Sequence, residues 1–257
     1  MLKRMLGSLV VVLFLCGVPA ALSQMEQTPT AYTYVSQFQV PRAQWAQFTE
    51  DQEKTTNPIF ERLMADGTLV AWSNFETIVH TPEGMTHGAS WTSTSLTGIM
   101  RVLDELRKVG PRPGQVASTK HEDLLMRSSV IHSSSVSGGS GYLRVVCTVT
   151  QPGKSDDYVA AVKKYLGPTF EEQFKKGVTT YYGFDQQYVN TDNPSLRCLV
   201  ITYPNADAMN KWATAVETTF DKMSPTDRKG WADAQANTTV PNSRRDFMAR
   251  LTHYAQK

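Results

Sequence analysis

The sequence is poor in cysteine, in net charge and in long apolar stretches. It has 3 cysteines among 257 residues and a formal net charge of +2. The small number of cysteines excludes a densely cross-linked disulfide scaffold. The low net charge disfavours a nucleic-acid binder that depends on electrostatic attraction. The apolar run Met5–Cys16 is shorter than the roughly 20 residues that span a bilayer, and no later stretch is apolar enough to do so. The chain also contains no phosphate-binding loop, no nucleophile-base signature and no dense metal motif, so no reaction is identified.

The first 23 residues have the features of a secretory signal peptide. Lys3 and Arg4 precede the apolar run Met5–Cys16, and the small residues Ala21 and Ser23 follow it. A basic start, a short apolar core and a small-x-small end are typical of such signals. We therefore expect cleavage after Ser23 and a soluble chain that is secreted or periplasmic.

Cleavage changes both the charge and the cysteine content of the chain. Removal of 23 of the 257 residues takes away Lys3, Arg4 and Cys16 but no acidic residue, so the mature chain has 234 residues and a formal charge of zero. Only Cys147 and Cys198 remain, and two cysteines in an oxidising compartment can pair. No basic cluster alternates with aromatic residues, so we expect no nucleic-acid partner.

The remaining chain shows an internal repeat whose matches keep their order along the sequence. The clearest matches are Pro58-Ile59-Phe60-Glu61 with Pro168-Thr169-Phe170-Glu171, Gly67 with Gly177, and Asp123-Leu124-Leu125-Met126-Arg127 with Asp246-Phe247-Met248-Ala249-Arg250. Between the copies, residues 133–141 have the serine and glycine content of a flexible linker. We therefore predict a signal peptide over 1–23, repeat 1 over 30–132, a linker over 133–141 and repeat 2 over 142–257.

Each repeat has the same predicted order of elements, β-α-β-β-α-β, which is that of a ferredoxin-like unit. The predicted strands are 32–40, 68–80, 86–94 and 121–131 in repeat 1, and 142–149, 178–190, 195–203 and 245–254 in repeat 2. We expect Pro58 and Pro168 to kink or break the first helix of each repeat, and Gly67 and Gly177 to end it. Residues 224–243 have no counterpart in repeat 1 and are expected to form a helix and a loop.

Two such units in one chain resemble the dimeric α+β barrel superfamily, in which two ferredoxin-like units pack their sheets face to face. The resemblance rests on the element order and the repeat, and it covers nearly the whole mature chain. It implies an α+β fold in which both repeats form the barrel within one chain. Members include small-molecule monooxygenases, haem-dependent or haem-degrading enzymes and isomerases, so the fold does not select one function. The Asn/Trp/His set of the haem-degrading members is not carried over, because repeat 1 has no asparagine in its first strand.

Three polar residues of repeat 1 form the first candidate site, which would be catalytic. His80 and His87 flank the turn between two predicted strands, and Glu76 shares a strand face with His80. Two imidazoles and a carboxylate bind zinc, iron or copper, and a neutral histidine acts as a base near pH 7. The alternative is that both histidines are solvated surface residues. Repeat 2 lacks the set, because Asn190 and Gln186 replace His80 and Glu76.

Aromatic residues of the predicted strands form the second candidate site, a pocket for a small molecule. The ligand-binding candidates are Tyr34, Trp72, Asn74, Trp91 and Tyr182. Aromatic walls with a few polar groups are typical of such pockets, and the alternative is ordinary core packing. Cys147 and Cys198 lie on neighbouring predicted strands of repeat 2, where a cross-strand disulfide and two free thiols are both consistent with the sequence.

These observations favour an exported, soluble protein that binds a small molecule or has an accessory role. One alternative is a cofactor-independent monooxygenase-like or isomerase-like enzyme, and another is a haem or metal protein that uses the histidines of repeat 1. The expected partner is a small-molecule ligand, with no nucleic acid and no stable membrane anchor. The sequence leaves open the ligand or substrate, whether the chain is an enzyme, whether it binds a metal or cofactor and whether it forms oligomers.

Overall fold

Eight antiparallel strands close into a barrel in the computed structural model, which describes residues 30–80, 83–189 and 195–257. The strands are β1 (Thr30–Gln39), β2 (Ala71–Thr77), β3 (His87–Ser93), β4 (Lys120–Ser133), β5 (Val136–Val149), β6 (Tyr181–Gln187), β7 (Leu196–Tyr203) and β8 (Arg245–Gln256). Their order around the barrel is β1-β3-β2-β8-β5-β7-β6-β4. The fold is therefore mixed α+β, as expected. The signal peptide predicted over 1–23 lies outside the described residues.

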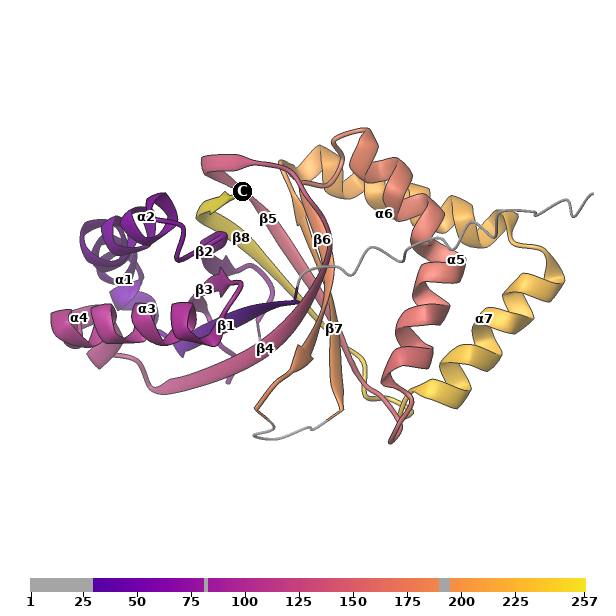
Figure 1. Ribbon diagram of the computed structural model, residues 1–257, viewed down its shortest axis with the longest axis horizontal. Coiled ribbons are helices and arrows are strands. Elements are labelled where there is room, and N and C mark those ends of the chain that lie inside the picture. Colours follow the sequence, from indigo (N-terminus) through magenta and orange to yellow (C-terminus); the bar gives the residue numbers. More distant parts are fainter. Residues whose placement is uncertain (1–29, 81–82, 190–194) are drawn as a thin grey trace, which may run out of the picture.

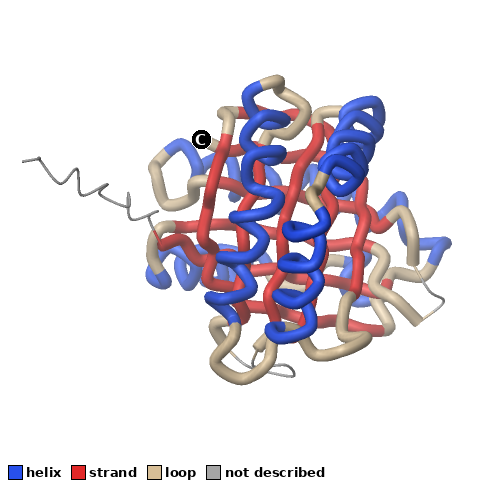
Figure 2. Tube along the Cα trace, turned by 90° about the vertical axis from the view of Figure 1, so that its right-hand side faces the viewer, coloured by secondary structure: helices blue, strands red, loops and turns tan. Residues whose placement is uncertain are grey.

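Helices cover two opposite sides of this barrel (Figure 1). They are α1 (Trp45–Asp51), α2 (Asn57–Ala65), α3 (Leu96–Val109), α4 (Pro113–Val116), α5 (Ser155–Lys175), α6 (Ala206–Lys222) and α7 (Pro225–Thr238), with a 3-10 turn η1 (Arg42–Gln44) and a π-helix η2 (Gln52–Thr56). Those of the first half of the chain (residues 30–133) lie on one side, and those of the second half (residues 134–257) lie across the strands on the other (Figure 2). None of the helices in the described residues is both long and apolar enough to cross a membrane.

Side chains along each strand alternate between the barrel interior and a helix layer, because the side-chain period of a strand is two residues. In β2, Trp72 packs against Phe60 of α2 with ring centroids 5.3 Å apart. Phe75 of the same strand instead packs inside the barrel, 5.6 Å from the ring of Phe247 in β8. Apolar cores therefore form under both helix layers and within the barrel.

Equivalent glycines end the first long helical segment of each half. Gly67 and Gly177 have φ angles of 81° and 69°, a left-handed conformation that glycine adopts without a Cβ penalty. These helix ends confirm the sequence prediction. The prolines behave differently in the two halves. The π-helix Gln52–Thr56 directly precedes Asn57 and Pro58 in the first half, whereas α5 continues unbroken through Pro168, with buried side chains on both sides of it. Of the two outcomes expected at Pro168, a kink or a break, the break is therefore wrong.

The segment 133–141 is not a flexible linker. It belongs to two long strands, because β4 ends at Ser133 and β5 begins at Val136. Gly141 permits close packing, since a Cβ on it would lie 2.4 Å from the carbonyl oxygen of Tyr203. The composition of the segment therefore reflects a crowded, irregular part of the β5–β8 pairing, where the register shifts, and not freedom of the chain.

The extra segment of the second half forms the helix expected over 224–243. Ser224 caps the N-terminus of this helix, α7, because its hydroxyl accepts a hydrogen bond from the backbone N–H of Asp227. α7 packs on the outside of α5, where Trp231 and Tyr165 lie with ring centroids 6.0 Å apart. The second half therefore carries an additional helix over α5.

Candidate functional site

His87, one of the predicted catalytic residues, is a buried core residue. It pairs across the hairpin with Glu76, but it is only 2% exposed. Its ring packs against Trp45 and Phe48 with centroids 4.9 and 5.1 Å away, and its Nδ1 lies 3.0 Å from the hydroxyl oxygen of Thr86. Burial, and then the positive charges of Arg42 and His80, lowers the pKa of His87 to about 4. The imidazole is therefore neutral and enclosed at physiological pH.

His80 does not complete a catalytic set with His87 and Glu76. It is exposed beyond the end of β2, with its ring 6.0 Å from that of Trp45. Within the described parts of the chain, no group of three or more His, Cys, Asp and Glu side chains is placed to hold a metal ion. The structure therefore does not assemble His80, His87 and Glu76 into the site that their spacing suggested.

Two of the five predicted ligand-binding residues lie together in one cleft. Tyr34 of β1 and Trp91 of β3 stack with ring centroids 4.6 Å apart and an interplanar angle of 17°. Trp72 and Asn74 are buried beneath α2, where Asn74 Nδ2 donates to the side chain of Asn57 over 2.5 Å. They therefore belong to the core between sheet and helix.

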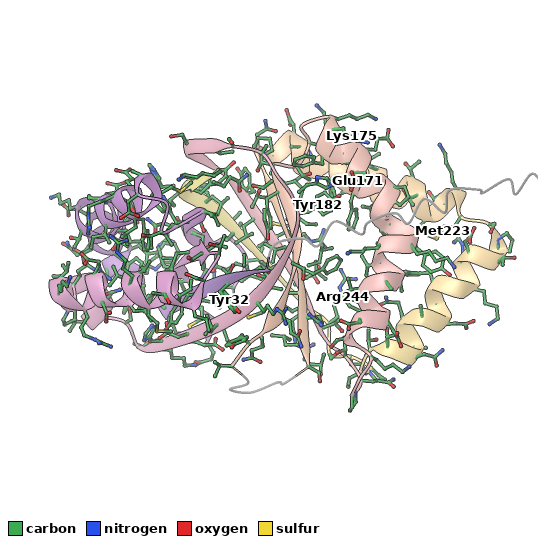
Figure 3. All side chains as sticks on the ribbon, in the orientation of Figure 1. Tyr32, Glu171, Lys175, Tyr182, Met223 and Arg244 are labelled. Carbon is green, nitrogen blue, oxygen red and sulfur yellow. A yellow bond between two sulfur atoms is a disulfide. The ribbon has the colours of Figure 1, made fainter. Side chains whose placement is uncertain are left out.

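Tyr182, the fifth predicted ligand-binding residue, lies in the other half of the molecule. Its ring packs against Phe170 of α5, and its hydroxyl donates to Glu171 Oε1 over 2.8 Å (Figure 3). The same carboxylate oxygen lies 2.6 Å from His132 Nε2 at the end of β4. Tyr182 therefore joins α5 to the sheet and is not part of a pocket with Tyr34.

An open cleft of about 620 Å³ lies between the strands β1, β3 and β4 and the helices α3 and α4. A small inner cavity of about 40 Å³ continues it toward the π-helix η2. Both spaces are lined by Ser36, Phe38, Trp91, Leu106, Arg112 and Gln115. We call the two spaces together the first-half cleft. A π-helical turn inside a helical segment is frequent at functional sites, and here it forms part of the inner wall.

The strand pairing of β1 with β4 brings four polar groups together on the wall of this cleft. The register sets Ser36 opposite Asp123 and places His121 opposite Phe38. His121 Nε2 lies 2.9 Å from the hydroxyl oxygen of Ser36 and 3.0 Å from Asp123 Oδ1. Its ring stacks on that of Phe38, with centroids 4.4 Å apart. The histidine is therefore held in one orientation beside a carboxylate, while about half of its side chain stays exposed.

Tyr34 completes this cluster as a hydrogen-bond donor. Its phenol donates to the carboxylate of Asp123. Burial, and then the negative charge of Asp123 and this hydrogen bond, raises the pKa of Tyr34 well above its usual value. Tyr34 therefore stays protonated and helps to position Asp123, the carboxylate beside which the imidazole of His121 lies.

The inner part of the cleft presents buried polar atoms that lack partners. Trp91 Nε1, Arg112 Nη1 and Thr56 Oγ1 are buried and have no hydrogen-bond partner among the described residues. Buried donors are normally satisfied, so each such group calls for a bound acceptor or water. Two of the three donors, the indole and the guanidinium, bind an oxygen atom of a ligand well. The cleft therefore offers an aromatic wall, a base and unpaired donors.

The corresponding position of the second half has a different chemistry. Asp246, which the predicted repeat aligns with Asp123, is held by two guanidinium groups, one of them that of Arg244 (Figure 3). Arg244 Nε and Arg144 Nη2 lie 2.9 and 2.7 Å from its carboxylate oxygens. These hydrogen bonds, that from Arg244 first, lower the pKa of Asp246. Neither arginine can act as a base at physiological pH, so the proton-accepting group is found in the first half.

His121 and Arg112 are not among the site residues that the sequence predicts. The predicted repeat aligns Asp123 with Asp246, and the residue two positions earlier is His121 in the first half and Arg244 in the second. This difference between aligned positions is the signal in the sequence that could have marked His121 as a site residue. No comparable signal marked Arg112, which directly precedes α4, the short helix that packs against α1.

The two cysteines in the described part of the chain lie on the barrel wall away from this cleft. Cys147 of β5 and Cys198 of β7 face each other across the strand pair and are joined by a disulfide, with their Cα atoms 4.0 Å apart. Both line the barrel interior. The first-half cleft and the disulfide are therefore on different faces of the sheet.

Comparisons with known proteins identify the fold and no more. No protein-family model and no curated sequence matches the chain. A candidate monooxygenase from Lactobacillus acidophilus NCFM aligns with a TM-score of 0.62 at 12% identity, over 88% of this chain and 96% of that one. A candidate monooxygenase from Fusobacterium nucleatum subsp. nucleatum gives 0.61 at 10% identity, over 89% and 95%. An anthrone oxidase-like protein gives 0.53 at 10% identity, over 89% and 93%. The chain therefore shares the overall fold of these three structures.

Proposed function

We propose that the first-half cleft binds a small planar aromatic molecule and oxidises it with molecular oxygen in a monooxygenase-like reaction. The observation that carries the proposal is the position of the His121–Asp123 pair beside the stacked rings of Tyr34 and Trp91 in one open cleft. Stacked aromatic walls favour a flat, electron-rich substrate. The fold neighbours described as candidate monooxygenases and as an anthrone oxidase-like protein support the same reaction class.

The groups of the cleft suit proton removal from an acidic carbon. In this proposal His121 takes a proton from the methylene carbon of an anthrone-type substrate, and Asp123 stabilises the imidazolium that forms. The negative charge moves to the substrate's carbonyl oxygen, where Arg112 Nη1 and Trp91 Nε1 are available as donors. The base and the donors therefore act on the same intermediate.

Molecular oxygen is the oxidant in the balanced reaction. The carbanion transfers electrons to O2 and forms a carbon–oxygen bond, which gives a peroxide after protonation. Loss of the second methylene proton with cleavage of the oxygen–oxygen bond then yields a ketone and one water molecule. One oxygen atom enters the product and the other leaves as water.

Oxygen consumption with anthrone as the probe tests this proposal. Wild-type protein should consume one O2 for each anthraquinone formed, and His121→Asn should lower the rate by about 10²- to 10⁴-fold, the usual contribution of a general base. His80→Asn is the matched control, because His80 is an exposed histidine of the same half and should leave the rate unchanged. An undiminished rate for His121→Asn, measured above the oxidation of anthrone without protein, would contradict the proposal.

A non-catalytic binding role is the second candidate function, and the open aromatic cleft alone is sufficient for it. In that case anthraquinone should quench the fluorescence of Trp91 in a saturable manner while no oxygen is consumed. Trp91→Phe should then remove most of the quenching. Quenching with turnover supports the oxidation, and quenching without turnover supports binding alone.

We also propose that the chain is exported and consists of two ferredoxin-like repeats. The disulfide between Cys147 and Cys198 supports an oxidising compartment. The strand orders β4-β1-β3-β2 and β8-β5-β7-β6 within the barrel support the duplication, because corresponding strands occupy corresponding places. The mass of the mature protein isolated from its natural host tests export, which requires an N-terminus at Gln24. A mature protein that still begins at Met1 would contradict cleavage.

A further inference from the structure

The barrel interior contains a cavity of about 220 Å³ that the proposed reaction does not use. Much of its wall is apolar and comes from both halves, with Val35, Leu124, Leu143, Val145, Val200 and Phe247 among the lining residues. An apolar cavity of about 150 Å³ is enough to bind benzene, so this one has room for a ring with a short chain. Side chains alternate across each strand, and the sheet therefore separates this cavity from the first-half cleft.

Among the described residues that line the cavity, only Asp185 has a charged side chain. It lies on β6 between Ser128 of β4 and Cys198 of β7, and it is only 7% exposed. The Ser128 hydroxyl donates one hydrogen bond to its carboxyl group. Its Oδ1 has no hydrogen-bond partner in the described part of the chain. A buried acceptor of this kind is destabilising unless something donates to it.

We propose that the barrel interior is a second binding site, which takes a small aromatic amine whose ring fills the apolar cavity and whose ammonium group donates to Asp185 Oδ1. The apolar wall supplies the affinity for the ring. A charge-assisted hydrogen bond supplies the selectivity for the amine. Carboxylic acids of the same size are excluded, because they would place a second negative charge beside Asp185.

The surroundings of Asp185 agree with a cationic ligand. Burial raises the pKa of this carboxyl group to about 6, so it is ionised above that pH. Among the described residues of the cavity wall, no positive side chain is present to pair with it. Tyr181, a neighbour on the same strand, is protonated, since burial and the charge of Asp185 raise its pKa. The cation that would balance Asp185 is therefore left to the ligand.

Calorimetric titration with 2-phenylethylamine tests the proposal, with propylbenzene as the neutral probe of similar shape. Wild-type protein should bind both compounds in a saturable manner. Asp185→Asn should lower the affinity for the amine by about ten- to a hundredfold, the usual contribution of a hydrogen bond to a charged group. It should bind propylbenzene as tightly as the wild type, which shows at the same time that the variant is folded and that its cavity is intact. Absence of amine binding, or equal affinity of both proteins for the amine, would overturn the proposal.

The location of the bound amine is tested independently of the reaction in the first-half cleft. His121→Asn should bind 2-phenylethylamine like the wild type. Methyl resonances of Leu143 and Val200, which line the barrel cavity, should shift on binding. Loss of amine binding in His121→Asn, or shifts confined to residues of the first-half cleft, would place the amine in that cleft and refute a second site.

Discussion

His87 gives a pH dependence of stability whose size follows from its burial. In the folded protein its pKa is about 4, mainly because burial penalises the imidazolium form and also because Arg42 and His80 are positively charged. In the unfolded chain the pKa returns to 6.5. A difference of about 2.5 pKa units corresponds to roughly 3 kcal/mol of stability. That contribution is fully present above pH 6.5 and is lost as the pH falls toward 4, because only the unfolded chain takes up the proton.

The variant His87→Phe isolates this contribution. It retains a ring between Trp45 and Phe48 but has no group that titrates. Urea unfolding of wild type and variant at pH 7 and at pH 4 gives the two free energies of unfolding. The difference between wild type and variant should fall by about 3 kcal/mol from the higher to the lower pH, because all other titrations cancel.

The same variant also tests whether His87 is catalytic. We expect His87→Phe to oxidise anthrone at the wild-type rate at pH 7, since the histidine is enclosed and lies outside the residues that line the first-half cleft. If the free energies of unfolding of variant and wild type changed equally between pH 7 and pH 4, the conclusion that burial lowers the pKa of His87 would be refuted. Loss of turnover in a folded His87→Phe would return this residue to the catalytic site.

Three further outcomes follow from the structure. The carboxyl group of Asp185, with a pKa of about 6 in the folded protein, should make the free energy of unfolding fall by roughly 2 kcal/mol from pH 4 to pH 7, which is opposite in sign to the effect of His87. Asp185→Asn should remove this pH dependence in urea unfolding, and the same pH dependence in variant and wild type would contradict the prediction. Replacement of Cys147 and Cys198 by serine should lower the unfolding free energy by about 4 kcal/mol for a crosslink that spans 51 residues, and reduction of the wild type should add the mass of two hydrogens. Gly88→Ala should lower the melting temperature, because its Cβ would lie 2.3 Å from Phe75 Cζ and 2.6 Å from the carbonyl oxygen of Ser36; an unchanged melting temperature would show that the strands can move apart.

The strands and helix ends were largely predictable from the sequence, because local patterns determine them. Alternation around Trp72 and Phe75 follows from the two-residue period of a strand, and the glycines Gly67 and Gly177 mark helix ends that need a positive φ. Composition was misleading over 133–141. Small residues occur both in flexible linkers and where two backbones approach closely, and only the position of Tyr203 against Gly141 distinguishes these cases.

The candidate site was only partly predictable, because its parts meet through long-range pairing. Tyr34 and Trp91 were recognisable as aromatic residues on strands. Their polar partners were not, since Ser36 and His121 are 85 residues apart and meet only through the register of β1 with β4. His87 was misleading for the opposite reason. Its position near a turn suggested exposure, but the helix α1 covers it with aromatic side chains.

Oxygen-18 labelling is the most direct test of the first-half cleft as an oxidation site. Wild-type protein, incubated with anthrone under labelled O2 in ordinary water, should form anthraquinone that contains one labelled oxygen atom for each molecule. His121→Asn, measured in parallel, should form labelled product only at the rate seen without protein. Product oxygen that comes from water, or labelled product formed equally fast by His121→Asn, would contradict the assignment of His121 as the base.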